Sequence, residues 1–183
     1  MNIVLIGYRA SGKTSVGRRL AVLLGYSFCD TDEIVAESTG KTIRQIVDEG
    51  GWPLFREIEK DAIAGISPSD RCVVAFGGGA VLDEGNVKRF SENSLFIWLK
   101  ADVETVLHRM NEDIKSDEQR PPLSSGSPWL EVKATLRSRE EVYRKHANFI
   151  VDTGNRSIQE VSEEIQRIVQ SFHRLSILSG FFC

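Results

Sequence analysis

The chain has 183 residues, of which 41% are hydrophobic and 27% are charged, a composition typical of one globular domain with a full core. Its net charge of −3 argues against a general attraction to nucleic acid or to an anionic membrane surface. No stretch approaches the roughly 20 apolar residues of a membrane span, and the first apolar run is too short for a secretory signal. We therefore expect a single domain over residues 1–183 that is cytoplasmic and monomeric.

The three cysteines, Cys29, Cys72 and Cys183, are scattered and lack the spacing of metal ligands. We interpret them as free thiols in a reducing cytosol. The three histidines also lack partners at metal-ligand spacing, so we expect them to be ordinary surface or packing residues.

The phosphate-binding pattern Gly-x-x-x-x-Gly-Lys-Thr occupies residues 7–14, directly after an apolar run and before a helical pattern. Its glycines let backbone N–H groups form a nest for phosphate, and the following helix adds its positive dipole end. Lys13 can reach the β- and γ-phosphates, and the Thr14 hydroxyl can ligate Mg²⁺. A glycine turn without a ligand would not explain why strand, lysine, threonine and helix all agree. The residues expected to bind a nucleoside triphosphate here are Gly7, Ala10, Ser11, Gly12, Lys13, Thr14 and Ser15.

Strand-like and helix-like patterns alternate along the chain. The predicted strands are Ile3–Ile6, Tyr26–Cys29, Cys72–Phe76, Leu95–Leu99 and Phe149–Val151. The predicted helices are Lys13–Leu24, Asp32–Ser38, Thr42–Glu49, Pro53–Ile66, Asp102–Arg109, Leu130–Lys145 and Ser157–Ser171. This alternation predicts an α/β fold whose parallel sheet has helices on both faces. Gly7, Asp30 and Gly77 each follow a strand directly, so we expect their loops to meet where such sheets bind ligands.

Residues 111–129 differ from the rest because they are acidic, contain three prolines and have little apolar periodicity. We interpret this stretch as a lid whose Arg120 can close onto the phosphates, with a solvated linker as the alternative. The apolar tail over residues 171–183 could extend the last helix, pack onto the body or contact a partner.

Five further motifs make the pattern specific. They are Asp30-Thr31-Asp32, Phe55-Arg56-Glu57-Ile58-Glu59, Gly77-Gly78-Gly79-Ala80, Arg120-Pro121 and Arg139. Together with the phosphate loop, they make the chain resemble the shikimate kinases over about residues 2–170. The resemblance implies a P-loop fold like that of nucleoside monophosphate kinases, with a five-stranded parallel sheet and a lid. It also implies Mg²⁺-dependent transfer of the ATP γ-phosphate to the 3-hydroxyl of shikimate, in aromatic amino-acid biosynthesis.

The resemblance also implies roles for single residues. Lys13, Asp32 and Arg120 would be catalytic, with Asp32 as the candidate base and hydrogen-bond partner of substrate hydroxyls. Thr14 would ligate the magnesium ion, and Asp30 would act on it through water.

On the acceptor side, Arg56 and Arg139 would hold the substrate carboxylate, and Glu59 would hold the acceptor-side arginine. Gly77, Gly78 and Gly79 would support the ring. Arg109, Arg120 and Arg156 would contact the nucleotide, the first and last at the adenine.

The chemistry of shikimate supports these roles independently. A carboxylate suits planar bidentate guanidinium groups, hydroxyls suit a fixed acceptor carboxylate, and a ring lying on backbone suits residues without Cβ. Phosphoryl transfer needs in-line placement and neutralised oxygens rather than covalent help.

Each role has a simpler alternative. Asp32 could only cap the following helix, and Arg56 with Glu59 could be a surface ion pair. Arg139 could belong to a solvated charged face, and the three glycines could form a turn without a ligand. We expect Tyr8, a bulky residue in the phosphate loop, to face outward.

Two other functions compete with the first. Another small-metabolite kinase, such as a gluconate kinase, would share the phosphate loop but would not need two arginines set for a carboxylate. A catalytically silent nucleotide-binding relative would be expected to lack Lys13, Asp32 or Arg139, and all three are present.

Overall fold

The computed structural model describes residues 1–66, 71–112 and 127–178. Arg120, most of the expected lid and the last residues of the apolar tail lie outside the described residues. What the sequence predicts for them stays a prediction.

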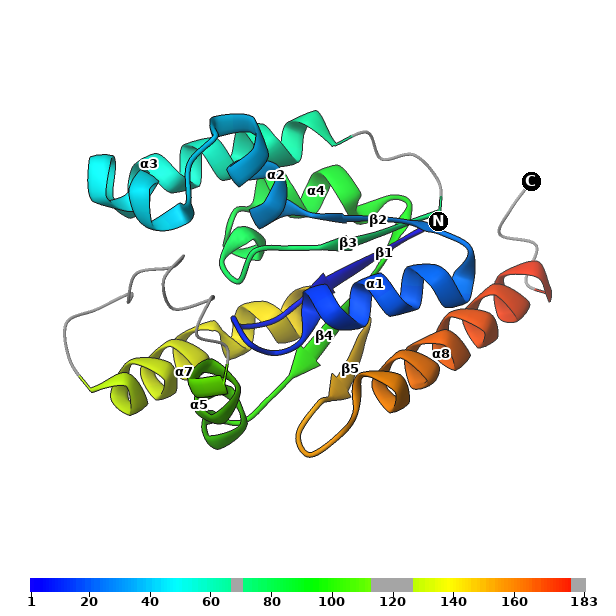
Figure 1. Ribbon diagram of the computed structural model, residues 1–183. Helices are drawn as coiled ribbons and strands as arrows, with labels where there is room; N and C mark the ends of the chain where they lie inside the picture. Colours follow the sequence, from blue (N-terminus) through cyan, green and yellow to red (C-terminus); the bar gives the residue numbers. More distant parts are fainter. Residues whose placement is uncertain (67–70, 113–126, 179–183) are drawn as a thin grey trace.

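The centre of the molecule is a parallel sheet of five strands in the order β2-β3-β1-β4-β5 (Figure 1). The strands are β1 (Asn2–Ile6), β2 (Ser27–Asp30), β3 (Cys72–Ala75), β4 (Ser94–Lys100) and β5 (Phe149–Asp152). Each lies within about one residue of a predicted strand, so the predicted sheet is confirmed. Strand β1 lies in the middle, between β3 and β4, so the phosphate loop leaves the sheet at its centre.

Helices cover both faces of the sheet (Figure 1). They are α1 (Lys13–Leu24), α2 (Thr31–Thr39), α3 (Ile43–Gly65), the 3-10 turn η1 (Ala80–Leu82), α4 (Glu84–Ser91), α5 (Val103–Glu112), α7 (Pro128–His146) and α8 (Ile158–Leu178). Successive β1 side chains alternate between the faces. Ile3 and Leu5 pack with α1 and α8, whereas Val4 and Ile6 pack with α4, α7 and the end of α3.

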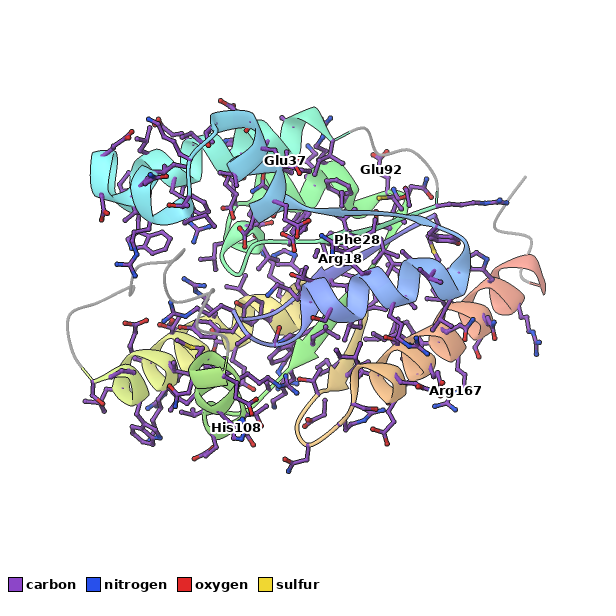
Figure 2. All side chains as sticks on the ribbon, viewed as in Figure 1. Arg18, Phe28, Glu37, Glu92, His108 and Arg167 are labelled. Carbon is purple, nitrogen blue, oxygen red and sulfur yellow. The ribbon has the colours of Figure 1, made fainter. Side chains whose placement is uncertain are left out.

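Helix α1 is held closely against the edge strand β2. A Cβ atom added at Gly17 would lie 2.5 Å from the Phe28 ring, so only glycine permits this approach. The Arg18 guanidinium lies 4.9 Å from the centre of the same ring (Figure 2), a distance at which a cation is attracted to an aromatic face. This contact holds the first half of α1 against β2, the two elements that carry Thr14 and Asp30.

Two helices begin with a capping box, and the first is at the start of α3. Thr42 Oγ1 accepts a 3.2 Å hydrogen bond from the Gln45 N–H, and Gln45 Oε1 accepts a 2.8 Å bond from the Thr42 N–H. Such reciprocal bonds satisfy N–H groups that have no partner within the helix. Ser157 and Glu160 make the same exchange before α8.

Three features differ from the expected elements. The two helices expected on either side of Gly50-Gly51 form one interrupted helix, α3, whose break is at Gly51 with φ 71° and ψ −178°. Helix α4 was not predicted, although Asp83 caps it by accepting hydrogen bonds from Gly85 and Asn86. Helix α8 continues past Ser171 to Leu178, so part of the apolar tail extends the last helix.

In the described ranges, no helix combines the length and the apolar character needed to cross a membrane.

Candidate active site

The phosphate loop joins β1 to α1 in a conformation that depends on glycine. Gly7 has φ 142° and Gly12 has φ 95°, backbone angles that other residues rarely adopt. A Cβ atom at Gly7 would also lie 2.5 Å from the Leu99 carbonyl oxygen. Gly12 caps α1 without a side-chain hydrogen bond, which leaves the first N–H groups of the helix to bind an anion.

Lys13 and Thr14 begin α1 at this loop. The Lys13 ammonium group is buried and donates a 2.8 Å hydrogen bond to the Tyr8 carbonyl oxygen. The Thr14 hydroxyl donates a 2.6 Å hydrogen bond to Asp30 Oδ2, at the end of β2. The hydroxyl and carboxylate predicted to serve a magnesium ion are therefore in direct contact.

Asp30, not Asp32, caps helix α2. Asp30 Oδ1 accepts a 3.0 Å hydrogen bond from the Asp32 N–H, and the Asp30 side chain is buried. Burial raises the pKa of Asp30, and the Asp32 charge raises it further, whereas the Thr14 hydrogen bond lowers it. The capping role considered for Asp32 therefore belongs to its neighbour, and Asp32 lies in the first turn of α2.

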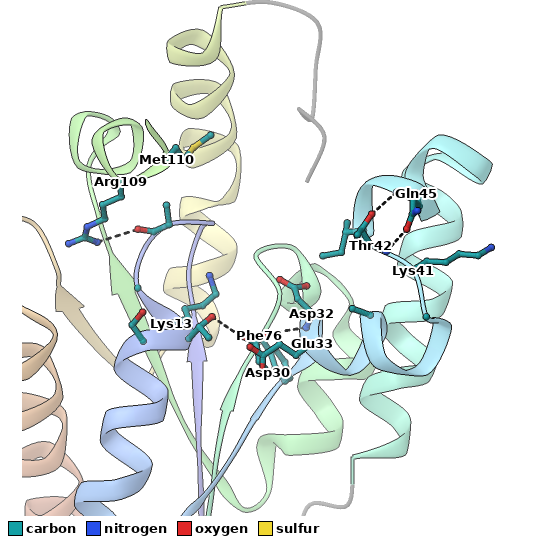
Figure 3. Close-up of a pocket in the computed structure, with 17 residues that line it drawn as sticks. Lys13, Asp30, Asp32, Glu33, Lys41, Thr42, Gln45, Phe76, Arg109 and Met110 are labelled. Carbon is teal, nitrogen blue, oxygen red and sulfur yellow. Dashed lines mark hydrogen bonds between the residues drawn. The ribbon is translucent and has the colours of Figure 1, made fainter. Parts of the chain in front are cut away.

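A cavity of about 750 Å³ runs beside the phosphate loop (Figure 3). Gly12–Ser15, Asp30 and Asp32 form its centre, the α2–α3 turn with Lys41 lies on one side, and Arg109 with Met110 lies on the other. Arg109 donates hydrogen bonds to the Ala10 and Thr153 carbonyl oxygens, at 3.3 and 2.5 Å. This places Arg109 beside the phosphate loop, where the sequence predicted a nucleotide contact.

A second, narrower hollow adjoins the first. The residues that line it are Tyr8, Arg9, Asp32, Ile43, Trp52, Phe55, Arg56, Gly78 and Arg139. Asp32 and Ile43 line both spaces. Thus the phosphate loop borders the large cavity, and the two arginines predicted to bind a carboxylate border the narrower hollow. Asp32 lies on the wall that the two spaces share.

Arg56 and Glu59, one turn apart on α3, form an ion pair that is not on the surface. The Glu59 carboxylate is 2% exposed, and the Arg56 guanidinium is one-third exposed. Burial raises the pKa of Glu59 to about 7; the Arg56 charge opposes this shift, and the Asp32 charge adds to it. Glu59 therefore holds Arg56 at the wall of the narrower hollow, as the sequence predicted. The protonation state of the Glu59 carboxyl group changes as the pH passes through neutrality.

The glycine triplet after β3 is enclosed by charged groups. A Cβ atom at Gly77 would lie 2.4 Å from Glu59 Oε1 and 2.6 Å from Asp32 Oδ1. A Cβ atom at Gly79 would lie 2.1 Å from Arg56 Nη2. All three separations are far below van der Waals contact, so a Cβ at either position would displace these side-chain ends. The glycine loop is therefore pressed against side chains of the candidate site, and its contact with a substrate ring stays a prediction.

Arg139 reaches the same triplet from α7. It donates a 2.9 Å hydrogen bond to the Gly78 carbonyl oxygen, and the Tyr143 hydroxyl donates a 2.6 Å bond to the same atom. Arg139 is half-buried and lines the narrower hollow. It therefore does not belong to a solvated charged face, although neighbouring Arg137 does.

The expectation that Tyr8 faces outward is wrong. Tyr8 is 2% exposed and packs beside Val106 of α5 and Val132 of α7. Its ring is drawn inward because α5 and α7 supply an apolar surface next to the phosphate loop, and this neighbourhood depends on contacts between distant parts of the chain.

Arg9 and Glu131 are site residues that the sequence did not indicate. Arg9 Nη2 donates a 2.7 Å hydrogen bond to Glu131 Oε1, and the Glu131 side chain is only 4% exposed. The partners are 122 positions apart, so no local spacing pointed to them. Nothing in the sequence pairs them, because the burial of Glu131 appears only in the folded structure.

Arg156 lies apart from the large cavity. It donates to the Asp152 carbonyl oxygen at 3.0 Å and forms an ion pair with Glu164 at 2.6 Å. Together with Asp102, His108 and Arg109 it lines a separate hollow. Arg109 lines both this hollow and the large cavity, whereas Arg156 lines the hollow and not the large cavity. The adenine contact predicted for Arg156 therefore stays a prediction.

The comparisons with known proteins agree with one another. The shikimate kinase family model matches residues 9–170. A shikimate kinase of Syntrophus aciditrophicus is 40% identical over 178 residues, which cover 93% of this chain and 91% of that protein. A structure of shikimate kinase from Acinetobacter baumannii in complex with shikimate has a TM-score of 0.85 at 30% identity and covers 93% of both chains. A gluconokinase structure from Sinorhizobium meliloti, at 20% identity, a TM-score of 0.57 and coverage of 96% and 97% of the two chains, shares the fold alone.

Proposed function

The chain belongs to the shikimate kinase family and is a phosphotransferase with an alcohol acceptor, and we propose that its two adjoining pockets hold ATP and shikimate for direct transfer between them. The large cavity takes ATP, and the narrower hollow takes shikimate. The γ-phosphoryl group passes to the 3-hydroxyl, giving shikimate 3-phosphate and ADP in the pathway to chorismate and the aromatic amino acids.

The phosphate loop and the start of α1 bind the triphosphate. Backbone N–H groups from Gly7 to Ser15 face the phosphate oxygens, and Lys13 exchanges its hydrogen bond with the Tyr8 carbonyl for one with a phosphate. Arg120 completes this arrangement from the lid, which is the role that the family resemblance gives it. Arg109 contributes beside the loop.

Magnesium fits the residues at the end of β2. Thr14 would supply a direct hydroxyl ligand and Asp30 a carboxylate that acts through water; the two oxygens are 2.6 Å apart and are the hard donors that Mg²⁺ prefers. The described ranges contain no group of three or more His, Cys, Asp or Glu side chains suited to a metal. Mg²⁺ commonly binds to one or two protein groups, and water and substrate phosphates supply its other ligands. When bound, the ion would neutralise charge on the phosphate oxygens.

Arg56 and Arg139 bind the carboxylate of shikimate, each through a planar guanidinium group. Asp32 hydrogen-bonds the acceptor hydroxyl and takes its proton as the hydroxyl oxygen attacks the γ-phosphorus. The bond from that phosphorus to the β,γ-bridging oxygen breaks, and ADP leaves. Gly77, Gly78 and Gly79 allow the ring to lie against backbone.

The observation that carries the proposal is the position of Asp32 on the wall of both pockets. The test is a phosphate-transfer assay with shikimate, gluconate and nucleoside monophosphates as acceptors. We expect turnover with shikimate and little with the others. Turnover only with gluconate or a nucleotide would remove the proposal, and nucleotide binding without any turnover would favour a silent relative.

The variant Asp32→Ala sharpens this assay. Glu37→Ala is its matched control, because Glu37 is an exposed carboxylate on the outer side of the same helix (Figure 2). Transfer should be lost in the first variant and kept in the second. Size-exclusion chromatography with light scattering would test the monomer, and fractionation the cytoplasmic location, that we expect from the sequence.

A further inference from the structure

Two cysteines on neighbouring strands lie in contact beside the magnesium ligands. Cys29 Sγ on β2 and Cys72 Sγ on β3 are 3.8 Å apart. The strands pair with Ser27 opposite Cys72 and Cys29 opposite Val74. Paired residues of parallel strands, and residues two apart on one strand, point to the same side of a sheet. Both thiols therefore lie on one face, diagonal to each other.

The two cysteines differ in burial. Cys72 is buried, whereas Cys29 is half-buried. Among the described strands, β2 is at the edge of the sheet and pairs with β3 alone. A shift of β2 would therefore break no second ladder, although it would move the contact of Phe28 with α1. A disulfide bond is about 2.05 Å long, which means that the sulfur atoms must approach by about 1.8 Å from 3.8 Å.

This approach would be transmitted directly to the magnesium site. Cys29 immediately precedes Asp30, whose carboxylate accepts the Thr14 hydroxyl and caps α2. A shift of Cys29 toward Cys72 would draw the Asp30 backbone with it and disturb both hydrogen bonds. Displacements of about 1 Å at a catalytic site can lower turnover about 100-fold.

We propose that Cys29 and Cys72 are a site of reversible oxidation by peroxides, and that the disulfide formed there lowers the activity of the enzyme. One thiol of the pair reduces the peroxide and becomes a sulfenic acid, while one oxygen leaves as water or an alcohol. The other thiol then attacks that sulfur, the sulfur–oxygen bond breaks and water leaves. One peroxide is reduced, and two thiols are oxidised to one disulfide.

The test uses the full chain carrying Cys183→Ser, so that only the pair remains. The protein is treated with hydrogen peroxide, and the mass of the intact chain and the transfer rate are measured before and after dithiothreitol. We expect the mass to fall by two hydrogen atoms, turnover to fall at least about tenfold, and dithiothreitol to restore both. The same protein with Cys72→Ser or with Cys29→Ser should form no disulfide, and under the same treatment each variant should keep most of the turnover that the parent protein loses.

Three results would overturn the proposal. They are the absence of the disulfide in the parent protein, an equal and equally reversible inactivation of the Cys72→Ser variant, and a complete disulfide that leaves turnover unchanged. The mass measurement does not depend on the proposed function, and the untreated enzyme reports on that function separately.

Discussion

The Thr14 hydroxyl donates a 2.6 Å hydrogen bond to the buried Asp30 carboxylate, joining the start of α1 to the end of β2. The two residues belong to different strand–helix units, and the contact joins the phosphate loop to the segment that carries Asp32. Substitutions of Thr14 can separate the effect of its hydroxyl group from the effect of its size.

We expect Thr14→Ser to retain most activity and Thr14→Val to lose it. Serine keeps the hydroxyl, whereas valine keeps the shape and removes the oxygen. Loss of one electrostatic group in a phosphoryl-transfer site costs about 100- to 1,000-fold in turnover. Turnover measured against Mg²⁺ concentration should show Thr14→Val requiring more metal. Equal Mg²⁺ curves for valine and serine would contradict the metal role.

Asp32→Asn should lower turnover by about 100- to 10,000-fold, the range for acid–base groups, and leave ATP affinity nearly unchanged. The amide cannot take the proton of the acceptor hydroxyl but fills the same space. Single-turnover kinetics and nucleotide titration calorimetry would measure the two quantities. Near-normal turnover would reduce Asp32 to a structural residue of α2.

Arg139→Ala should weaken shikimate binding by about 2–5 kcal/mol, the cost of removing one partner of a buried charge pair. The effect should fall on the KM for shikimate and not on that for ATP. Arg137→Ala is the control, because Arg137 is an exposed arginine on the same helix. An effect confined to ATP would overturn the assignment of Arg139 to the acceptor.

Gly77→Ala tests the crowding around the glycine triplet. The added Cβ would be 2.4 Å from Glu59 Oε1 and 2.6 Å from Asp32 Oδ1, so we expect a loss of about 1–3 kcal/mol of stability from overpacking and a strong loss of turnover. Gly65→Ala is the control, because a Cβ there meets nothing within 4 Å. Urea denaturation and the transfer assay would measure both variants. An equal effect of the two substitutions would contradict the steric argument.

Glu59 should make stability depend on pH in the neutral range. Burial raises its pKa from 4.5 to about 7, so the folded protein binds more protons than the unfolded chain between these values. The free energy of unfolding therefore falls as the pH rises through this window. The contribution is at most about 3.5 kcal/mol, from about 1.4 kcal/mol per pKa unit.

Glu59→Gln cannot ionise and should lose this slope, whereas Glu57→Gln, at an exposed position of the same helix, should keep it. Denaturation at about pH 5 and about pH 8 brackets the window. Identical slopes for the parent protein and Glu59→Gln would show that another group titrates.

The order of elements could be predicted because it depends on local patterns. Each strand is a short apolar run, and the two capping boxes mark helix starts that the structure confirms. The phosphate loop could be predicted for the same reason, since its glycines, Lys13 and Thr14 are consecutive. The break at Gly51 was also visible, although the two halves continue as one interrupted helix.

The rest of the site depends on contacts across the fold. Arg139 and Gly78 are 61 positions apart, and Arg9 and Glu131 are 122 apart. Only the family resemblance pointed to Arg139, and nothing in the sequence pointed to Glu131. The burial of Tyr8 and Glu59 likewise follows from helices that pack over them, so residue type alone predicted an outward tyrosine and allowed a surface ion pair.

One loop shapes both spaces: Gly12 and Lys13 line the large cavity, and Tyr8 and Arg9 line the narrow one. If a ligand in one space shifts this loop, the surface offered in the other space changes as well. By thermodynamic reciprocity, that coupling would be equal in both directions. Mutations at residues 8 and 9 that redirect acceptor choice would therefore also change nucleotide binding, which narrows the paths by which this enzyme can acquire a new acceptor.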